Sequence, residues 1–276
     1  MFLIFTFYYT KSHYICHKIY QKVIMDSVLL FLDDAEIDIF EISDLAIRMQ
    51  ISITRLQPTL ESLVKRGLLS RIEKGKYCRH NFRNEYVIAN FLAPNGAVAY
   101  WSALNLHGLT TQFPNTVFVQ TPKLKLNKSV FGVNYHFVKV KRSKASCYER
   151  TGYGSNAFWM TNIEKTIADC FDLPAYNGGY AELIFALNKA KLNSKKLIEA
   201  VKAIDNIAVI KRLGYLIEVL GKGNLSQFTD FALSCVNTKY NLIDPQSEDN
   251  GAFNAKWKLR LNISEQDILE MSKNVY

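Results

Sequence analysis

Apolar residues recur at helical spacing in two neighbouring segments of the first third of the chain. Leu45, Ile47 and Met49 supply the apolar side of a first helix, and Ser43 is its expected N-cap. A second helix has an apolar face of four residues, namely Leu56, Leu60, Leu63 and Val64. The pattern predicts two short amphipathic helices joined by a tight connection.

A strand hairpin is expected directly after the second helix. Gly67 follows two basic residues, which is typical of a helix C-terminus. Leu68 and Leu69 begin a strand, and the turn at residues 74–76 reverses it. Helix, helix and hairpin in this order are typical of a winged helix-turn-helix. Pro58 is discordant, so we expect the second helix to start near Thr54 or later.

Charge separates the two halves of this module. Residues 25–44 hold seven acidic residues and no Lys or Arg, whereas residues 48–83 hold nine Lys or Arg against two Glu. A positive surface displaces counterions from DNA, so this distribution favours DNA binding over the alternative, a helical domain for protein contacts. The expected groove-facing residues of the second helix are Ser52, Thr54, Arg55 and Thr59, and the expected contacts of the hairpin are Arg71, Lys74 and Lys76.

The rest of the chain predicts a second, mixed domain at residues 84–276, after a winged helix-turn-helix domain at residues 25–83. A helix is expected at residues 94–106, and strand-like runs follow at 116–121, 133–141 and 157–161. From residue 162 the pattern turns helical, and the tail predicts a strand at 256–262 and a helix at 264–272. The expected class is α+β, with strands first and a helical C-terminal part.

A second basic region lies between residues 121 and 151, with eight Lys or Arg and one acid. The functional interpretation is a further surface that contacts the DNA backbone through Lys139, Lys141 and Arg142. The alternative is that these side chains are the solvated outward positions of half-buried strands. The sequence favours neither.

Composition limits the class of protein. The chain has 276 residues, a formal net charge of +9 and 49% hydrophobic residues, which allows two folded domains and favours an anionic partner. Five scattered cysteines form no CxxC pair, so we expect neither disulfides nor a zinc site, and we expect a cytoplasmic location. Residues 1–24 have no usable periodicity, and we interpret them as a wrongly assigned start or a disordered, dispensable leader.

A nuclease is the enzymatic alternative for a basic, DNA-binding chain. Metal-dependent nucleases of the restriction type use a D/E-x-K element, and no Asp or Glu in this sequence has a Lys two residues later. Asp169 and Asp172 are interpreted as cap and surface residues of an apolar helix. We find no metal-site pattern outside the leader, no phosphate loop and no nucleophile elbow, so we expect neither catalysis nor a cofactor.

With these motifs in view, the chain resembles the AbiEi family, which comprises antitoxins of type IV toxin–antitoxin systems and related regulators of viral defence. The resemblance runs from Met25 to about Gly221, and residues 224–276 lie outside it. The R-G-L-L-x-R-x-x-K-G-x-Y run ends the first domain at Tyr77. The more specific motifs are AVAYWSALNLHGL at 97–109, NIEKTIADCFDLPAYNGGYAEL at 162–183 and IKRLGYLIEVLG at 210–221.

The resemblance implies a repressor that binds promoter repeats of its own operon and counteracts a nucleotidyltransferase-like toxin. A regulator of a defence locus without a toxin partner is the alternative. The residues that match the family pattern of the second domain are Glu164, Lys165, Thr166, Asp169, Arg212, Leu213, Gly214 and Glu218. We expect Leu213 in the core, Gly214 at a close helix contact, and Lys165 or Arg212 beside acids.

Overall fold

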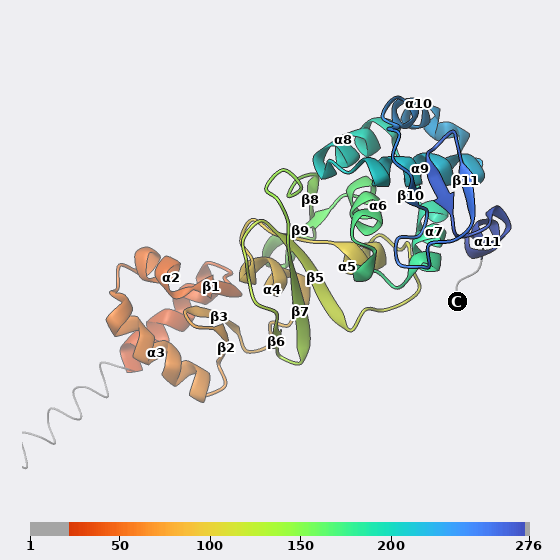
Figure 1. Cartoon of the computed structure of the whole chain (residues 1–276). Coiled ribbons are helices and arrows are strands. Elements are labelled where there is room, and N and C mark those ends of the chain that lie inside the picture. Colours follow the sequence, from red (N-terminus) through yellow and green to blue (C-terminus); the bar gives the residue numbers. More distant parts are fainter. Residues whose placement is uncertain (1–21, 274–276) are drawn as a thin grey trace, which may run out of the picture. The chain divides into compact units, whose positions relative to one another are not determined.

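The computed structural model in Figure 1 describes residues 22–273. The chain divides into two compact units, and the division falls between Asn84 and Glu85. The first 21 residues of the predicted leader lie outside the described residues.

Unit 1 combines three helices with a small three-stranded sheet within its described residues. A helix at residues 22–34 comes first. It is followed by β1 (Ile39–Glu41), α2 (Ile42–Met49), α3 (Ile53–Lys65), β2 (Leu69–Glu73) and β3 (Lys76–Arg79). The sheet order is β1-β3-β2, and both pairings are antiparallel. Figure 1 shows α2 and α3 in orange beside these strands.

The core of unit 1 is built by one apolar face from each helix. Leu56, Leu60 and Leu63 of α3 are fully buried, as the sequence predicts, and Leu45 of α2 lies in the same cluster. The helix at residues 22–34 covers this cluster, and its Ile24 packs against it. The predicted boundary between residues 24 and 25 therefore lies inside a helix.

The first predicted helix differs from α2 in two details. Glu41 occupies the N-cap position and Ser43 lies within the helix, so the N-cap prediction for Ser43 is wrong. Ile47 is 76% exposed, because residues two apart on a helix point about 200° apart and cannot both face the core with Leu45.

The start of α3 at Ile53, next to Thr54, its end and the hairpin all follow the sequence prediction. Gly67 has a φ of +69° directly after the helix, and Gly75 has a φ of +78° in the turn between β2 and β3. Pro58 lies at the sixth position of α3, beyond the first turn. Since proline has no N–H, the Thr54 carbonyl oxygen has no helical donor at that position. The three buried leucines hold the helix together across that point.

Unit 2 is built on a six-stranded mixed sheet with the order β6-β7-β5-β4-β9-β8. Strands β5 and β7 pair in parallel, as do β4 and β9, and the other neighbours are antiparallel. The strands are β4 (Ala97–Val98), β5 (Thr116–Thr121), β6 (Lys128–Val130), β7 (Val133–Lys139), β8 (Tyr148–Thr151) and β9 (Phe158–Thr161).

Helices pack on this sheet and on one another. Helix α6 is central, because it contacts α5, α7, α8, α9 and strand β9. The helices are α4 (Glu85–Leu92), α5 (Tyr100–Leu106), α6 (Ile163–Asp172), α7 (Tyr180–Lys189), α8 (Ser194–Ile204), α9 (Ile207–Val219), α10 (Ser226–Ser234) and α11 (Glu265–Met271). A second sheet has the order β10-β12-β11, formed by β10 (Asn241–Leu242), β11 (Ala252–Asn254) and β12 (Leu259–Leu261). The molecule is α+β.

The order of elements in unit 2 is less simple than the sequence predicts. The segment at 94–106 holds strand β4 as well as a shorter helix, α5, and residues 85–92, for which no element was predicted, form α4. Two helices therefore precede β5, and three short strands follow α10. Short strands and an apolar eight-residue helix give too little periodicity to be recognised.

Candidate nucleic-acid interface

The N-terminal end of α3 presents polar side chains to solvent. Ser52 is the N-cap residue, and its carbonyl oxygen accepts the N–H groups of Arg55 and Leu56 at 3.0 Å each. Ser52, Thr54 and Arg55 are all exposed. The Thr54 hydroxyl donates to the Ser52 hydroxyl at 3.3 Å. Three of the four predicted groove-facing side chains are thus accessible at the start of this helix.

The prediction that Thr59 faces the DNA groove is wrong. Its side chain is only 4% exposed, and its hydroxyl donates to the Arg55 carbonyl at 3.4 Å. Thr59 lies one position from Leu60 and three from Leu56, which places it on the buried face. Gln57 occupies the exposed face instead, three residues after Thr54, and donates to Glu61 at 3.2 Å. The helical spacing of Gln57 from Thr54 indicates an exposed position, but the sequence prediction did not include Gln57.

The hairpin of unit 1 offers two exposed cations. Arg71 on β2 and Lys74 in the turn are exposed, as the sequence predicts. Lys76 differs, because its ammonium lies 3.3 Å from a carboxylate oxygen of Glu41 and 3.3 Å from one of Glu73. Its side chain is 13% exposed. Two carboxylates already neutralise this charge, so Lys76 is a weaker candidate for a phosphate contact than Arg71 and Lys74.

The predicted second basic region is exposed on unit 2. Lys139 ends β7, and Lys141 and Arg142 follow in the loop to β8. Tyr135 and Phe137 lie on the same face of β7 as Lys139 and are buried, so the exposure of Lys139 comes from its place at the end of the strand. The exposure of these three cations is compatible with contacts to a DNA backbone but does not by itself decide between the two interpretations.

A buried polar network lies inside unit 2, around the residues that match the family pattern on α6. Lys165 pairs with Asp169 one helical turn later, and the two side chains are 0% and 2% exposed. Gln120 on β5 donates to the other Asp169 oxygen at 3.0 Å and contacts the Tyr100 hydroxyl at 3.2 Å. Tyr148 donates to Gln120 at 3.4 Å. This network joins α5, α6, β5 and β8.

Burial determines the electrostatics of this network. Desolvation raises the pKa of Asp169 to about 6, although the neighbouring Lys165 lowers it. Burial likewise raises the pKa of Tyr100 well above its ordinary value, so this phenol remains a neutral hydrogen-bonding group. Tyr100 also has a φ of +54°, a strained conformation for a bulky residue at the first position of α5.

The buried network corrects the interpretation of Asp169 and Asp172 as cap and surface residues. Asp169 is enclosed with Lys165, as described. Asp172 pairs with Lys144, its side chain is 5% exposed, and it accepts from Asn206 at 2.8 Å. An apolar helix that carries a Lys and an Asp four residues apart can bury both when they neutralise each other.

The other matched residues of α6 also support the fold. One carboxylate oxygen of Glu164 accepts the Asn193 backbone N–H at 2.9 Å. The Thr166 hydroxyl contacts the Thr161 hydroxyl at 2.7 Å. Both side chains are buried, so neither is presented to a partner in this structure.

The matched residues of α9 hold the C-terminal segment. Leu213 is fully buried, as expected, and Gly214 allows close packing, since a Cβ there would lie 2.3 Å from the Trp257 ring. Arg212 donates to the Leu242 carbonyl at 2.9 Å. Glu218 accepts from the Trp257 indole at 2.6 Å and pairs with Lys256. These residues fix α9 against residues 242–257, a segment outside the family resemblance.

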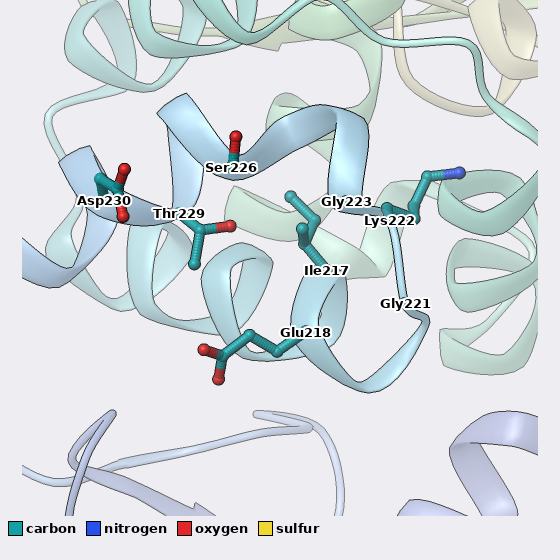
Figure 2. A pocket seen from close by; sticks show the side chains of 8 residues that line it. All are labelled: Ile217, Glu218, Gly221, Lys222, Gly223, Ser226, Thr229 and Asp230. Carbon is teal, nitrogen blue, oxygen red and sulfur yellow. The ribbon is translucent and has the colours of Figure 1, made fainter.

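A pocket of about 290 Å³ lies beside this contact, between the end of α9 and the start of α10 (Figure 2). Three of its polar side chains are already engaged within the protein, whereas Ser226 and Asp230 are exposed. Glu218 is bound to Trp257 and Lys256, and Lys222 extends to the carbonyl oxygens of Asn188 and Ala190 at 2.6 and 3.3 Å. The Thr229 hydroxyl donates to Leu225 at 3.3 Å. The pocket therefore offers few free groups to a ligand.

Within residues 22–273, no group of three or more His, Cys, Asp or Glu side chains is arranged to hold a metal ion. In the same range, no helix combines the length and apolar character needed to cross a bilayer.

Comparison with known proteins gives a fold likeness. No family model matches the sequence, and no curated protein matches it. The chain is similar to the crystal structure of the RV2827C protein from Mycobacterium tuberculosis, with a TM-score of 0.58 and 13% sequence identity. The match covers 90% of this chain and 94% of the other. At this identity the likeness concerns the fold alone.

Proposed function

We propose that unit 1 is a winged helix-turn-helix that binds double-stranded DNA, with α3 in the major groove and the β2–β3 hairpin against phosphates. The main observation in support of this proposal is that α3 has a buried face and a solvent-facing one. Leu56, Leu60 and Leu63 anchor one face in the core, while Thr54 and Arg55 point to solvent at the helix start. A helix held in this way presents its N-terminal side chains to base edges without losing its packing.

The charge around α3 supports DNA as the partner. Arg55 at the helix start and Arg71 and Lys74 in the hairpin are exposed. The proposal gives base contacts to the helix and backbone contacts to the hairpin. Lys139, Lys141 and Arg142 of unit 2 are additional candidates for backbone contacts, since they are exposed as well.

The wider proposal is a cytoplasmic antitoxin that represses its own operon and counteracts a nucleotidyltransferase-like toxin. It is supported by the resemblance of the motifs at 97–109, 162–183 and 210–221 to the AbiEi family. The proposal includes no enzymatic activity and no cofactor. Asp169, one of the two acids considered for catalysis, is neutralised by Lys165 out of contact with solvent. A regulator of a defence locus without a toxin is the alternative.

The test is repression of a reporter fused to the DNA upstream of this gene. The wild-type protein should repress, and Arg55→Ala should restore expression while the protein remains folded. Lys195→Ala on α8 is the matched control, because it removes an exposed cation from a different helix. Reporter expression that Arg55→Ala leaves fully repressed would contradict the assignment of α3.

Co-expression with the neighbouring gene separates the two forms of the proposal. If that gene encodes a nucleotidyltransferase-like toxin, the antitoxin proposal predicts arrested growth from the toxin and recovery when this chain is added. If this chain does not restore growth, the antitoxin proposal fails, and the alternative of a regulator without a toxin partner is favoured.

A further inference from the structure

A hollow of about 370 Å³ lies on unit 2, apart from the buried network and from the pocket in Figure 2. Three segments form its walls: the turn before β4, the end of β5 and the loop between β7 and β8. They supply Asn95, Lys123 and Arg142 as polar groups, with Pro122 and Ala145 as apolar ones. None of the described residues that line it is acidic.

The first two walls are held together by close backbone packing. A Cβ on Gly96 would lie 2.8 Å from the Gln120 carbonyl oxygen, so only glycine lets the turn approach the end of β5 this closely. Asn95, next to it, has a φ of +70°, a conformation that asparagine tolerates better than most residues. The turn therefore holds the Asn95 backbone at the rim of the hollow.

The wall that carries Lys123 is fixed by Thr121. The Thr121 carbonyl accepts the Val140 N–H at 3.0 Å, which ties the end of β5 to the residue after β7. The Thr121 hydroxyl accepts the Lys123 N–H at 3.3 Å. The backbone of Lys123 is thus held in place, while its ammonium group is exposed.

The loop that carries Arg142 is fixed by contacts of Lys144. Lys144 pairs with Asp172 on α6, and its backbone N–H donates to the Lys141 carbonyl at 2.9 Å. Asn206 holds the second oxygen of Asp172 at 2.8 Å. Within residues 22–273, no ion pair holds Arg142, so its charge is available to a ligand.

Two exposed cations on fixed backbone, facing one hollow without a carboxylate, form a field that attracts an anion. Guanidinium and ammonium groups donate several hydrogen bonds to a phosphate, and the side-chain amide of Asn95 adds a neutral donor. We propose that this hollow binds a phosphate group, with Arg142 and Lys123 as its principal ligands. The group belongs either to a nucleic-acid backbone or to a small phosphorylated molecule, and both sources share the same chemistry.

The test compares the full-length protein with the double variant Lys123→Gln/Arg142→Gln. Binding of inorganic pyrophosphate is measured by isothermal titration calorimetry at low salt. Because charge-assisted hydrogen bonds are lost, the double variant should bind at least about tenfold more weakly. The matched control is Lys191→Gln/Lys273→Gln, which removes two exposed positive charges from other segments and should bind as the wild type does.

A second arm identifies the source of the phosphate. Affinity for a random-sequence duplex is measured at several salt concentrations. If the hollow contacts the backbone, the slope of log affinity against log salt should fall by about two units in the double variant. Weaker pyrophosphate binding with an unchanged slope supports a small phosphorylated ligand at the same site.

Equal pyrophosphate binding by wild type and double variant would overturn the proposal. The site does not depend on the function proposed for unit 1. Arg55→Ala should leave pyrophosphate binding unchanged, so failure of either proposal is seen separately.

Discussion

Lys165 and Asp169 lie one turn apart on α6 and form an ion pair that is almost completely closed to solvent. Gln120 holds the second carboxylate oxygen at 3.0 Å, so the acid is satisfied on both sides. A buried pair of this kind is held by mutual neutralisation, and the loss of one member leaves an uncompensated charge in the core.

We predict that Asp169→Asn lowers the free energy of unfolding by about 3–5 kcal/mol, because Lys165 is left as a buried, unpaired cation. Urea denaturation followed by circular dichroism measures the change. The double variant Lys165→Met/Asp169→Leu is the control, and it should be less destabilised than the single variant because both charges are gone. An Asp169→Asn variant as stable as the wild type would contradict this role.

The pair also predicts a pH dependence. Burial raises the pKa of Asp169 from 3.8 in the unfolded chain to about 6 in the folded protein. Between these values the folded state binds more protons than the unfolded state, so the contribution of Asp169 to stability falls as pH rises from about 4 to about 6. The stability difference between the wild type and the Lys165→Met/Asp169→Leu variant, measured across this range, should change in that direction. A difference that grows with pH would show that Asp169 has a lowered pKa instead.

Gly214 provides a test of packing on α9. An added methyl group would lie 2.3 Å from the Trp257 ring and 3.1 Å from Ala232. We expect Gly214→Ala to lower the free energy of unfolding by about 1–3 kcal/mol, as overpacking in a core usually does. Gly223→Ala is the matched control, since no atom lies within 4 Å of its added methyl group. Equal stability of the two variants would show that residues around Trp257 move freely.

The hairpin of unit 1 contains its own matched pair of lysines. Lys74 is exposed, whereas Lys76 is held between Glu41 and Glu73. We predict that Lys74→Ala reduces the slope of log DNA affinity against log salt by about one unit and that Lys76→Ala does not. Fluorescence anisotropy with a labelled duplex measures both. A larger effect from Lys76→Ala would mean that DNA breaks its ion pairs.

Most elements of the fold could be predicted from the sequence because they are long enough to show a hydrophobic period. α6 to α10 lie in the region expected to be helical from residue 162, and the buried leucines of α3 were predicted correctly. α4 was missed because eight mostly apolar residues show no period, and β4 because two residues cannot show one. Pattern alone cannot distinguish such elements from their neighbours.

The candidate site was predicted in part, for physical reasons that differ between residues. Arg55 is exposed on the face of α3 away from the buried leucines, and Lys74 is exposed in the turn between β2 and β3, so local sequence was enough to place them. Lys76 could not be judged from local sequence, since one of its partners, Glu41, comes from a strand 35 positions earlier in the chain. Asp169 was misplaced because its burial depends on Gln120, which lies on a distant strand.

The central claim is that α3 and its hairpin bind DNA, and the salt dependence of operator binding tests it most directly. The probe is the duplex upstream of this gene, and the variant is Arg55→Ala/Arg71→Ala/Lys74→Ala, which removes three exposed cations of unit 1. If Arg71 and Lys74 contact phosphates, the slope of log affinity against log salt should fall by about two units. Loss of the Arg55 base contact should lower the affinity further, and the thermal unfolding of the protein should be unchanged. A folded triple variant that binds the duplex with the wild-type affinity and slope would contradict the account.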